Sequence, residues 1–511
     1  MVLFLSVLLI KFAFCDGANI LFLAIIPLHS HQTALRPVYM DLASRGHQVT
    51  VVSCFQPNEV HENITHIYLK QILHGLSQFL GDDMKATDTL KSQQFTTFRG
   101  LNYALESILK DDMRELIKSG KKFDLIITEA CVRFSTVFSE VFQSPMVLIS
   151  TLGGSFDTFR MVSSPEQPIL YPIGIRKRFT NLTEMEKVVE TYRHFDLLKL
   201  YYDMGEFDEE MVRKYLGDDF PSIHEINNNI DLIMLNLHPL WDSNRPVPSN
   251  VIYLGGLQLQ KHKELSQDLQ TILDESEGVI FMSFGSAVRS SILNRKKIDM
   301  FVKVLSELPY TVLWKWDTEV ENLPENFIVR KWFPQRDLLR HPKIKLFITQ
   351  GGLQSVDESI DARVPMVGVP VLWDQFYNVH KIADLQIGVK CDVETVSEEQ
   401  FRNAVVDVLT DQRYRININK LRNVMNEKRQ RSLEKAIWWI EYVAQHKGAK
   451  HLRSPAFNMS TREYYELDLV LSVILFVIIL MFLVIRLIKY CCVLCCMSCI
   501  GIRRDTKVRL E

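Results

Sequence analysis

The stretch from residue 20 to residue 53, ILFLAIIPLHSHQTALRPVYMDLASRGHQVTVVS, contains one complete strand–helix–strand unit. Residues 20–26 form an unbroken apolar run, which is typical of a strand buried on both faces. Residues 35–45 follow a helical period, and residues 49–53 are rich in β-branched side chains. Because two strands joined by a helix run parallel, this unit predicts an α/β fold with a parallel sheet.

Apolar runs of the same kind continue in two series. In the first half, buried strands are expected at 123–128 and 145–150, with a helix over 131–142 between them. In the second half, helical stretches such as 293–308 and 353–363 alternate with short apolar runs at 231–236, 251–254, 278–284, 311–315, 344–349 and 365–369. A cluster of prolines marks a linker within residues 237–250. The sequence therefore predicts two α/β halves.

Residues 155–220 differ from both series, because apolar side chains are spread through a charged, helical stretch. These side chains are Phe156, Phe159, Met161, Met185, Tyr192, Phe195, Leu198, Tyr201, Tyr202, Met204 and Phe207. They are suited to lining an apolar substrate pocket or to contacting a membrane. A helical subdomain with an ordinary core explains them equally well.

The N-terminus has the pattern of a secretory signal peptide, assigned here to residues 1–15. Residues 2–10 are apolar, and Ala13-Phe14-Cys15 is a small-x-small cleavage pattern. The run is too short to span a membrane. A buried first strand is the alternative, but the run at residues 20–26 already supplies one.

The C-terminus has the pattern of a membrane anchor. Residues 469–485 carry no charge, acidic residues precede them and basic residues follow. We expect a transmembrane helix at 467–488 and a basic tail at 489–511. The positive-inside rule places this tail in the cytosol and the body of the protein on the other side of the membrane.

Cysteines and glycosylation sequons agree with this topology. Only Cys54, Cys131 and Cys391 lie in the large body, so no disulfide framework is expected. The tail cluster Cys491, Cys492, Cys495, Cys496 and Cys499 suits palmitoylation or reduced thiols better than zinc, because no His or acidic ligand lies among them. The sequons at Asn63, Asn181 and Asn458 all fall in the part predicted to be lumenal.

Composition and missing motifs exclude several function classes. The chain has 511 residues, of which 47% are hydrophobic and 23% charged, so it is neither disordered nor fibrous. The net charge of −2 gives no general attraction to nucleic acid. No G-x-G-x-x-G follows a strand, and neither a P-loop nor an Asp-x-Asp pair occurs, so we expect no bound cofactor and no metal.

Two groups of polar residues in the first half follow predicted strands. His29 and His31 come directly after the first strand, at the sheet edge where doubly wound folds bind ligands. A neutral His at a helix start can serve as a base, although Pro37 moves the expected start of the regular helix to about Arg36. Glu129 follows another strand and can orient such an imidazole. The alternative interpretations are that His29 and His31 are ordinary loop residues and that Glu129 is a surface acid that caps the next helix.

The second half contains the densest set of candidate site residues. A strand ending at Thr349 leads into a Gly-Gly turn and a helix whose first backbone N–H groups suit a diphosphate. A tight turn at Ser286 also suits phosphate. The remaining candidates supply a flat face for a base and polar groups for ribose and sugar hydroxyls, and the full set is Ser286, Trp332, Gln335, Gln350, Gly351, Gly352, Glu358, Asp374 and Gln375.

The block from Trp332 to Gln375 resembles the signature of the membrane-bound UDP-glycosyltransferases, and the resemblance covers nearly the whole chain. It implies the GT-B fold, with two facing Rossmann-like domains. The acceptor would bind residues 16–240 and the UDP-sugar residues 250–450. By resemblance, His31 is the catalytic base with Glu129 as its partner. The other matches are uracil stacking by Trp332, a nucleoside contact by Gln335, ribose binding by Glu358 and sugar-hydroxyl binding by Asp374 and Gln375.

Two residues depart from the family pattern. Gln350 stands where the family usually has His, and Glu129 stands where it usually has Asp. Gln can still donate a hydrogen bond to a phosphate but carries no charge. A sequence with Gln at position 350 resembles invertebrate members of the family, and this resemblance favours UDP-glucose as the donor.

The resemblance implies an inverting hexosyltransferase of the endoplasmic reticulum membrane, single-pass type I, with lumenal catalytic domains and a role in detoxification. The UDP-sugar is a co-substrate. The expected partners are this UDP-sugar, a small lipophilic acceptor and the membrane, with homo-oligomer formation left open and nucleic acid excluded. Three alternatives remain: a UDP-glucuronate-using enzyme, a catalytically silent binder of lipophiles or UDP, and a GT-B-like sugar-nucleotide epimerase.

Overall fold

The computed structural model describes residues 17–508 except 58, 70–71, 73–89, 155, 173–178, 286–292, 319 and 430–431. The predicted signal peptide at 1–15 and the candidate Ser286 lie outside the described residues. The chain divides into two compact units, a large one that ends at Ser454 and a small one that begins at Pro455.

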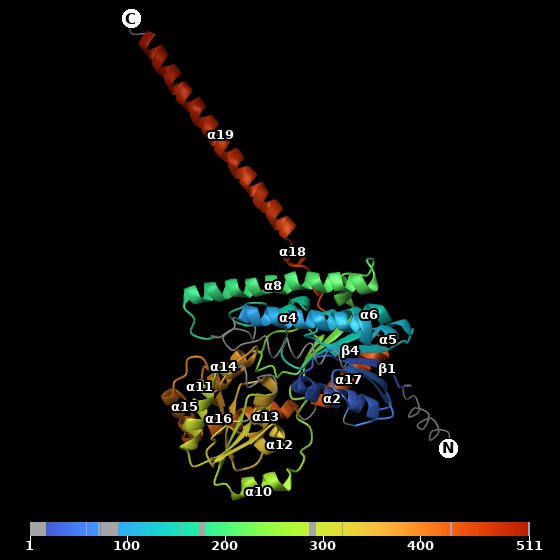
Figure 1. Cartoon of the computed structure of the whole chain (residues 1–511). Helices are drawn as coiled ribbons and strands as arrows, with labels where there is room; N and C mark the ends of the chain where they lie inside the picture. Colours follow the sequence, from blue (N-terminus) through green and yellow to red (C-terminus); the bar gives the residue numbers. More distant parts are fainter. Residues whose placement is uncertain are drawn as a thin grey trace, which may run out of the picture. The chain divides into compact units, whose positions relative to one another are not determined.

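The first half of the large unit is built on a seven-stranded sheet whose strands all run parallel (Figure 1). Its order is β3-β2-β1-β4-β5-β6-β7. The strands are β1 (Asn19–Ala24), β2 (Gln48–Ser53), β3 (Ile64–Tyr68), β4 (Leu125–Glu129), β5 (Met146–Ser150), β6 (Ile230–Leu235) and β7 (Val251–Tyr253). Every residue of β4, β5 and β6 is buried, which explains their continuous apolar sequences.

The helix α2 (His29–Ser44) connects β1 to β2, as the sequence predicts, but it begins earlier than expected. The expected start near Arg36 is wrong, because the carbonyl of Leu28 accepts hydrogen bonds from the backbone N–H groups of His31 and Gln32 and so closes the first turn. Pro37 lies inside the helix. His31 therefore lies in the first turn of α2, directly after the central strand.

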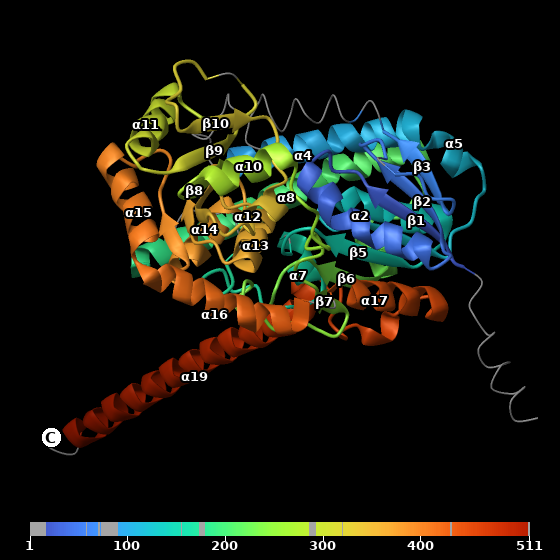
Figure 2. The same cartoon turned by 90° about the horizontal axis from the view of Figure 1, so that it is seen from below.

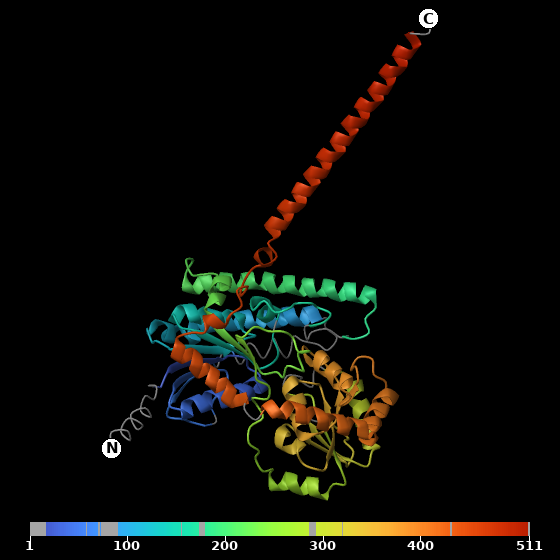
Figure 3. The same ribbon diagram turned by 180° about the vertical axis from the view of Figure 1, so that it is seen from behind.

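Two long helices, α4 (Leu90–Ser107) and α8 (Glu184–Leu216), lie side by side over the first half (Figures 1 and 3). The shorter helical elements of this half are η1 (Ile108–Asp112), α5 (Arg114–Lys118), η2 (Arg133–Thr136), α6 (Val137–Phe142), α7 (Phe156–Met161), α9 (Ile223–Ile226) and η3 (Asn227–Asn229). An ion pair between Arg133 and the buried Asp208 fixes α8 to the turn after β4.

The apolar side chains of residues 155–220 divide between inside and outside. Phe159 and Tyr201 line the large cavity described below, so the pocket interpretation holds for these two residues. Leu198 and Met204 are buried in the protein. Seven other apolar side chains of α8 are exposed, namely Met185, Val188, Val189, Tyr192, Phe195, Tyr202 and Phe207.

The second half of the large unit is built on a six-stranded parallel sheet of order β10-β9-β8-β11-β12-β13. Its strands are β8 (Val279–Ser283), β9 (Thr311–Lys315), β10 (Phe327–Arg330), β11 (Ile344–Thr349), β12 (Met366–Gly368) and β13 (Gly388–Lys390). Its helices are α10 (Gln267–Glu275), α11 (Arg295–Ser306), α12 (Gln335–Leu339), α13 (Leu353–Ala362), α14 (Gln375–Asp384), α15 (Glu398–Thr410) and α16 (Gln412–Arg429). The predicted α/β class is confirmed.

After α16 the chain returns to the first half. The helix α17 (Ser432–His446) packs on α2 and β6 (Figure 2), although it falls in the range 250–450 that the sequence assigns to the second domain. Ile437 and Ile440 belong to the hydrophobic core of the first sheet. The hydroxyl of Ser432 donates to the carbonyl of Gly255 at 2.7 Å, and the carboxylate of Asp231 accepts from the backbone N–H of Ala449 at 2.7 Å. The short helix η5 (Lys450–Leu452) follows.

The small unit contains α18 (Thr461–Tyr464) and the 42-residue helix α19 (Leu467–Val508). Within residues 467–497, an 18-residue window has a mean hydropathy of 3.2, so this part of the helix is long and apolar enough to cross a membrane. The predicted span at 467–488 lies within it. The helix also continues through most of the predicted basic tail.

Candidate active site

A cavity of about 1370 Å³ lies between the two halves and is lined by both. In each sheet the strand order reverses once, between β1 and β4 in the first and between β8 and β11 in the second. The segments that follow these four strands reach the cavity. Parallel sheets bind ligands at such reversal points, beyond the carboxyl ends of the strands. The candidates that line the cavity are His31, Trp332, Gln335, Gln350, Gly352, Glu358, Asp374 and Gln375.

Glu129 is fully buried beneath the cavity, and Oε1 of its carboxylate contacts Nδ1 of His31. The hydroxyl of Thr151 lies 2.9 Å from both of these atoms. Because Nδ1 faces the carboxylate, Nε2 is the ring nitrogen left for a substrate. This is the arrangement of a base whose orientation is fixed by a carboxylate. Thr151 is not among the residues predicted from the sequence, although it directly follows a buried strand at the same sheet edge.

Asp374 lies across the cavity from His31. Burial raises the pKa of its carboxyl to about 6, while a hydrogen bond of 2.8 Å from the Asn378 amide and the charge of His31 lower that pKa. Gln375, its neighbour, uses its side-chain oxygen to accept from the backbone N–H groups of Val371 and Leu372 at 3.0 and 2.9 Å. Gln375 therefore stabilises the loop that holds Asp374, and its amide NH₂ is the group left for a ligand.

The loop that carries Asp374 is held by the first half. Trp373 has a φ of +49°, a region that a bulky residue adopts only when its surroundings hold it there. Its backbone N–H donates to the side-chain oxygen of Gln93 at 3.2 Å, and its indole N–H donates to the hydroxyl of Thr97 at 3.3 Å. Both partners lie on α4. Neither residue is predictable from the sequence, because nothing local links α4 to a loop about 280 residues later.

Trp332 offers a half-exposed flat face, as the sequence predicts. Its ring centroid lies 4.7 Å from that of His29, and Nζ of Lys315 lies 5.9 Å from the ring centroid of Trp332. Burial and the nearby charge of Lys315 both lower the pKa of His29, which favours its neutral form. An aromatic face beside a cation suits a stacked nucleobase.

Gln335 and Glu358 are held together on the neighbouring wall. The amide of Gln335 donates to Glu358 Oε2 at 2.7 Å and to the hydroxyl of Ser355 at 2.9 Å. Burial raises the pKa of the Glu358 carboxyl to about 7, and the bond from Gln335 opposes this effect. An ionised carboxylate at this place can accept hydrogen bonds from a pair of ribose hydroxyls.

The Gly-Gly turn leads into α13, whose first turn has neither a side-chain cap nor an acidic residue. Gly351 has a φ of +85°, and a Cβ there would lie 2.3 Å from Val379 on α14, so only glycine fits. The uncapped N–H groups at the start of α13 suit an anion. A Cβ on Gly285 would lie 2.1 Å from the Gln350 amide nitrogen, so that amide packs against the turn after β8.

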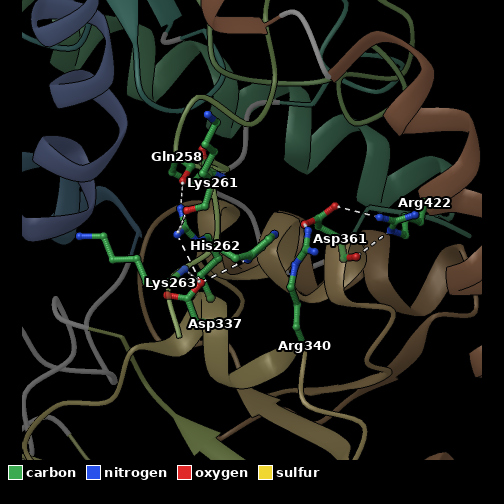
Figure 4. A network of polar contacts seen from close by, with 9 residues as sticks. Gln258, Lys261, His262, Lys263, Asp337, Arg340, Asp361 and Arg422 are labelled. Carbon is green, nitrogen blue, oxygen red and sulfur yellow. Dashed lines mark hydrogen bonds and ion pairs between the residues drawn. The ribbon is translucent and has the colours of Figure 1, made fainter. Parts of the chain in front are cut away.

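Polar contacts fix α12 and α13 behind these residues (Figure 4). The carboxylate of Asp337 on α12 faces His262 and the backbone N–H of Lys263, both at 3.2 Å, in the segment that joins the two halves. Asp361 on α13 pairs with Arg340 and Arg422. The helices that carry Gln335 and Glu358 are therefore connected both to each other and to the chain segment that enters the second half.

Comparisons with known proteins agree with this geometry. The family model described as "UDP-glucoronosyl and UDP-glucosyl transferase" matches residues 21–505. An ecdysteroid UDP-glucosyltransferase of the Spodoptera littoralis nuclear polyhedrosis virus is 34% identical over 477 residues, covering 88% of this chain and 92% of the viral protein. UDP-glucosyltransferase 2 of Dactylopius coccus is 30% identical over 464 residues, covering 89% of each chain.

Solved glycosyltransferase structures share the fold. A UDP-glucose:anthocyanidin 3-O-glucosyltransferase in complex with UDP superposes with a TM-score of 0.56 at 14% identity, covering 84% of this chain and all of the other. The glycosyltransferase of kitacinnamycin gives a TM-score of 0.55 at 18% identity, covering 84% of this chain and 99% of the other. The predicted GT-B fold with two Rossmann-like halves is confirmed.

The variant Gln93→Leu should weaken the binding of a UDP-sugar. It removes the acceptor for the Trp373 N–H, so the Asp374 loop loses one support, and we expect the donor KM to rise by about 2- to 12-fold from a hydrogen bond worth about 0.5–1.5 kcal/mol. Uridine, which lacks the transferred hexose proposed to reach Asp374, should bind as before. Steady-state kinetics and competition by uridine measure the two effects. If Gln93→Leu weakened the binding of uridine as much as that of the UDP-sugar, a role of Gln93 specific to the Asp374 loop would be contradicted.

Uridine binding should depend on the pH through Glu358. Because the pKa of this carboxyl is raised to about 7, it is ionised above that pH and protonated below it. Affinity for uridine should be constant above about pH 8 and fall by up to about tenfold per pH unit below 7. Glu358→Gln should bind weakly at every pH. A pH-dependent affinity in that variant would assign the effect to another group.

Proposed function

The chain belongs to the UDP-glucoronosyl and UDP-glucosyl transferase family, and we propose that it moves glucose from UDP-glucose to a hydroxyl group of a small lipophilic acceptor, with inversion at the anomeric carbon. One observation carries the proposal. The His31–Glu129 pair of the first half and Asp374 of the second half belong to one site, so a base and a sugar-binding group act on the same substrates.

In the proposed reaction, Nε2 of His31 removes the proton from the acceptor hydroxyl as its oxygen attacks the anomeric carbon. The new C–O bond forms as the bond from that carbon to the UDP oxygen breaks, on the opposite face of the sugar. Glu129 stabilises the imidazolium that results, and Thr151 keeps both groups in place. The N–H groups at the start of α13 stabilise the leaving diphosphate. All the catalytic groups in these proposed steps belong to the chain, and the UDP-sugar is a co-substrate.

The acceptor side of the cavity is lined largely by apolar and aromatic side chains, among them Phe55, Phe98, Leu101, Phe159 and Tyr201. Such a lining suits a lipophilic acceptor with few hydroxyl groups. Several viral relatives are named for ecdysteroids, so a polyhydroxylated steroid is a suitable first acceptor to test. Glycosylation makes such compounds more soluble, and this fits a role in detoxification.

The donor is proposed to be a neutral sugar. The ionised Asp374 would repel a second carboxylate on the donor, as in UDP-glucuronate. The nearest candidate cation on α14, Lys381, donates instead to the hydroxyl of Ser243 at 2.9 Å. Relatives from an insect and from several viruses are named UDP-glucosyltransferases, which also supports glucose. UDP-glucuronate use is the second candidate, and the presence of both His31 and Asp374 disfavours a silent binder.

We propose the endoplasmic reticulum membrane as the location, with α19 as a single span and the large unit in the lumen. The apolar part of α19 and the basic residues after it support this topology. Among the sequons, Asn181 is exposed, whereas the side-chain nitrogen of Asn63 donates to the carbonyl of Ala43 at 3.0 Å. A glycan is attached at the surface through the side-chain nitrogen, and the exposure of Asn181 favours it as the acceptor.

The variant His31→Ala should lower turnover by about two to four orders of magnitude, because it removes the base. UDP binding should remain within a few-fold of the original value, since His31 lies on the acceptor half. His29→Ala serves as the control, and its turnover should fall far less. Single-turnover transfer to a phenol and UDP binding measure the two effects. Near-normal turnover in His31→Ala, or the reverse ranking of the two variants, would refute the assignment.

UDP-glucose should support faster transfer than UDP-glucuronate to a common phenol. Asp374→Asn removes the negative charge while keeping the size, so it should raise the KM for UDP-glucose and narrow the preference between the two donors. Measurement of kcat/KM for both donors in both proteins tests this. Faster transfer from UDP-glucuronate in the unchanged enzyme would reverse the choice of donor and leave the mechanism intact.

Protease added to sealed microsomes should remove only residues that follow the span, after about Arg486. Endoglycosidase treatment should lower the apparent mass of the protein, and Asn181→Gln should remove a glycan. Immunoblots against each end of the chain distinguish the fragments. Digestion of the large unit in intact vesicles would show that the orientation is reversed.

A further inference from the structure

We propose that His31, Glu129 and Cys131 form an inhibitory binding site for Zn²⁺. One ring nitrogen of His31, one carboxylate oxygen of Glu129 and Sγ of Cys131 all lie within 4.8 Å of one another. Among the described residues, no other set of three or more His, Cys, Asp and Glu side chains gathers in this way.

The backbone brings these three residues together. Glu129 is the last residue of β4, and the backbone N–H of Val132 donates to its carbonyl at 3.0 Å. This bond closes a turn that brings Cys131 back beside the Glu129 carboxylate. His31 approaches from the first turn of α2, after the neighbouring strand β1. The three ligands thus come from two adjacent parallel strands, a fixed frame that suits metal binding.

The ligand types favour zinc. A thiolate, an imidazole and a carboxylate form a set of intermediate softness, which suits Zn²⁺ or Co²⁺ better than the hard ions Mg²⁺ and Ca²⁺. Three protein ligands leave a fourth position open to water, as in zinc sites that exchange a ligand. When the metal binds, the Cys131 thiol releases its proton to water, and the sulfur donates an electron pair to the metal.

The charges also balance. A dication with one carboxylate, one thiolate and a neutral imidazole has no net charge, which lowers the cost of binding at a buried place. Glu129 is fully buried, and its second oxygen, Oε2, has no hydrogen-bond partner. A buried carboxylate oxygen without a partner is costly, and a metal ion would satisfy it. Cys131 is partly exposed and lines the cavity, so an ion can reach the site from the substrate side.

Bound zinc would stop the reaction. Whichever ring nitrogen of His31 it takes, the metal either occupies the lone pair that accepts the substrate proton or displaces the proton that links His31 to Glu129. The inhibition rests on the proposed role of His31 as the base, whereas the binding of the metal rests only on the geometry. The two can therefore be tested separately.

Zinc inhibition is measured on the full-length enzyme in microsomes, with UDP-glucose and a phenol as substrates. Micromolar Zn²⁺ should inhibit the unchanged enzyme, EDTA should restore its rate, and Mg²⁺ should have no such effect. Cys131→Ser keeps the size of the side chain but removes the soft ligand. When rates are expressed relative to the metal-free rate of this variant, the half-inhibitory Zn²⁺ concentration should be at least tenfold higher than for the unchanged enzyme. Cys54→Ser, a change at a buried cysteine after β2, is the matched control.

Metal binding is measured by cobalt absorption. The purified full-length protein carries serine in place of the tail cysteines Cys491, Cys492, Cys495, Cys496 and Cys499, because these could also bind metal. Added Co²⁺ should produce the near-ultraviolet charge-transfer band of a cobalt–thiolate bond. Zn²⁺ should displace this band, and Cys131→Ser should remove it.

The outcomes separate the two parts of the proposal. A cobalt band that depends on Cys131, together with weaker zinc inhibition in Cys131→Ser, supports both. The absence of a band, or a band unchanged in Cys131→Ser, overturns the metal site. A band that depends on Cys131 without any zinc inhibition supports the site and overturns the inhibition together with the role of His31 as the base.

Discussion

The parallel arrangement of the strands is the constraint on which the rest of the structure depends. It places the carboxyl end of every strand in a sheet at one edge, and the reversal of strand order opens a crevice at that edge. The first sheet presents His31 and Glu129 at its reversal, after β1 and β4. The second presents the turns after β8 and β11 at its own. Because both edges open into one cavity, the proposed base and the proposed anion site, which come from separate sheets, face a shared space.

Burial determines the pKa values of the carboxyl groups of Asp374 and Glu358 at the cavity. Three carboxylates approach the cavity, and each has a different partner. Glu129 faces His31 and Thr151, Asp374 accepts from Asn378, and Glu358 accepts from Gln335. Burial raises the pKa of Asp374 to about 6 and that of Glu358 to about 7, so hydroxyl donors of the proposed substrates would stabilise the charged forms of both carboxyls. Only the carboxylate in contact with His31 is placed to stabilise a charge that arises during the proposed reaction.

The sequence predicts the central strands of both sheets because these are buried on both faces and read as apolar runs. The strands β3, β10 and β13 are not predicted from the sequence, because they are short and partly exposed. Candidate site residues at or shortly after the end of a strand are also predictable, among them His31, Glu129 and Gln350. Gln93 and Thr97 are not, because their partner Trp373 lies far away in the sequence and only the packed structure brings them together. The position of α17 is also not predictable from the sequence, because the amphipathic pattern of a helix does not indicate which sheet the helix covers.

Contacts between the halves make the donor subsite a property of the whole large unit. Trp241, in the segment after β6, donates its indole N–H to the side-chain oxygen of Asn378 at 2.9 Å, and the amide of Asn378 donates in turn to Asp374. The loop of Asp374 is thus supported from the first half twice, through Trp241 and through α4. The helix α17 adds a third connection, because the chain leaves the second half to complete the core of the first. A second half taken alone would keep its anion site at α13 but lose the supports that place Asp374 opposite His31. In the proposed site, the anion-binding start of α13 is therefore local to one sheet, whereas the position of Asp374 and the contact of Trp332 with His29 depend on how the two halves pack.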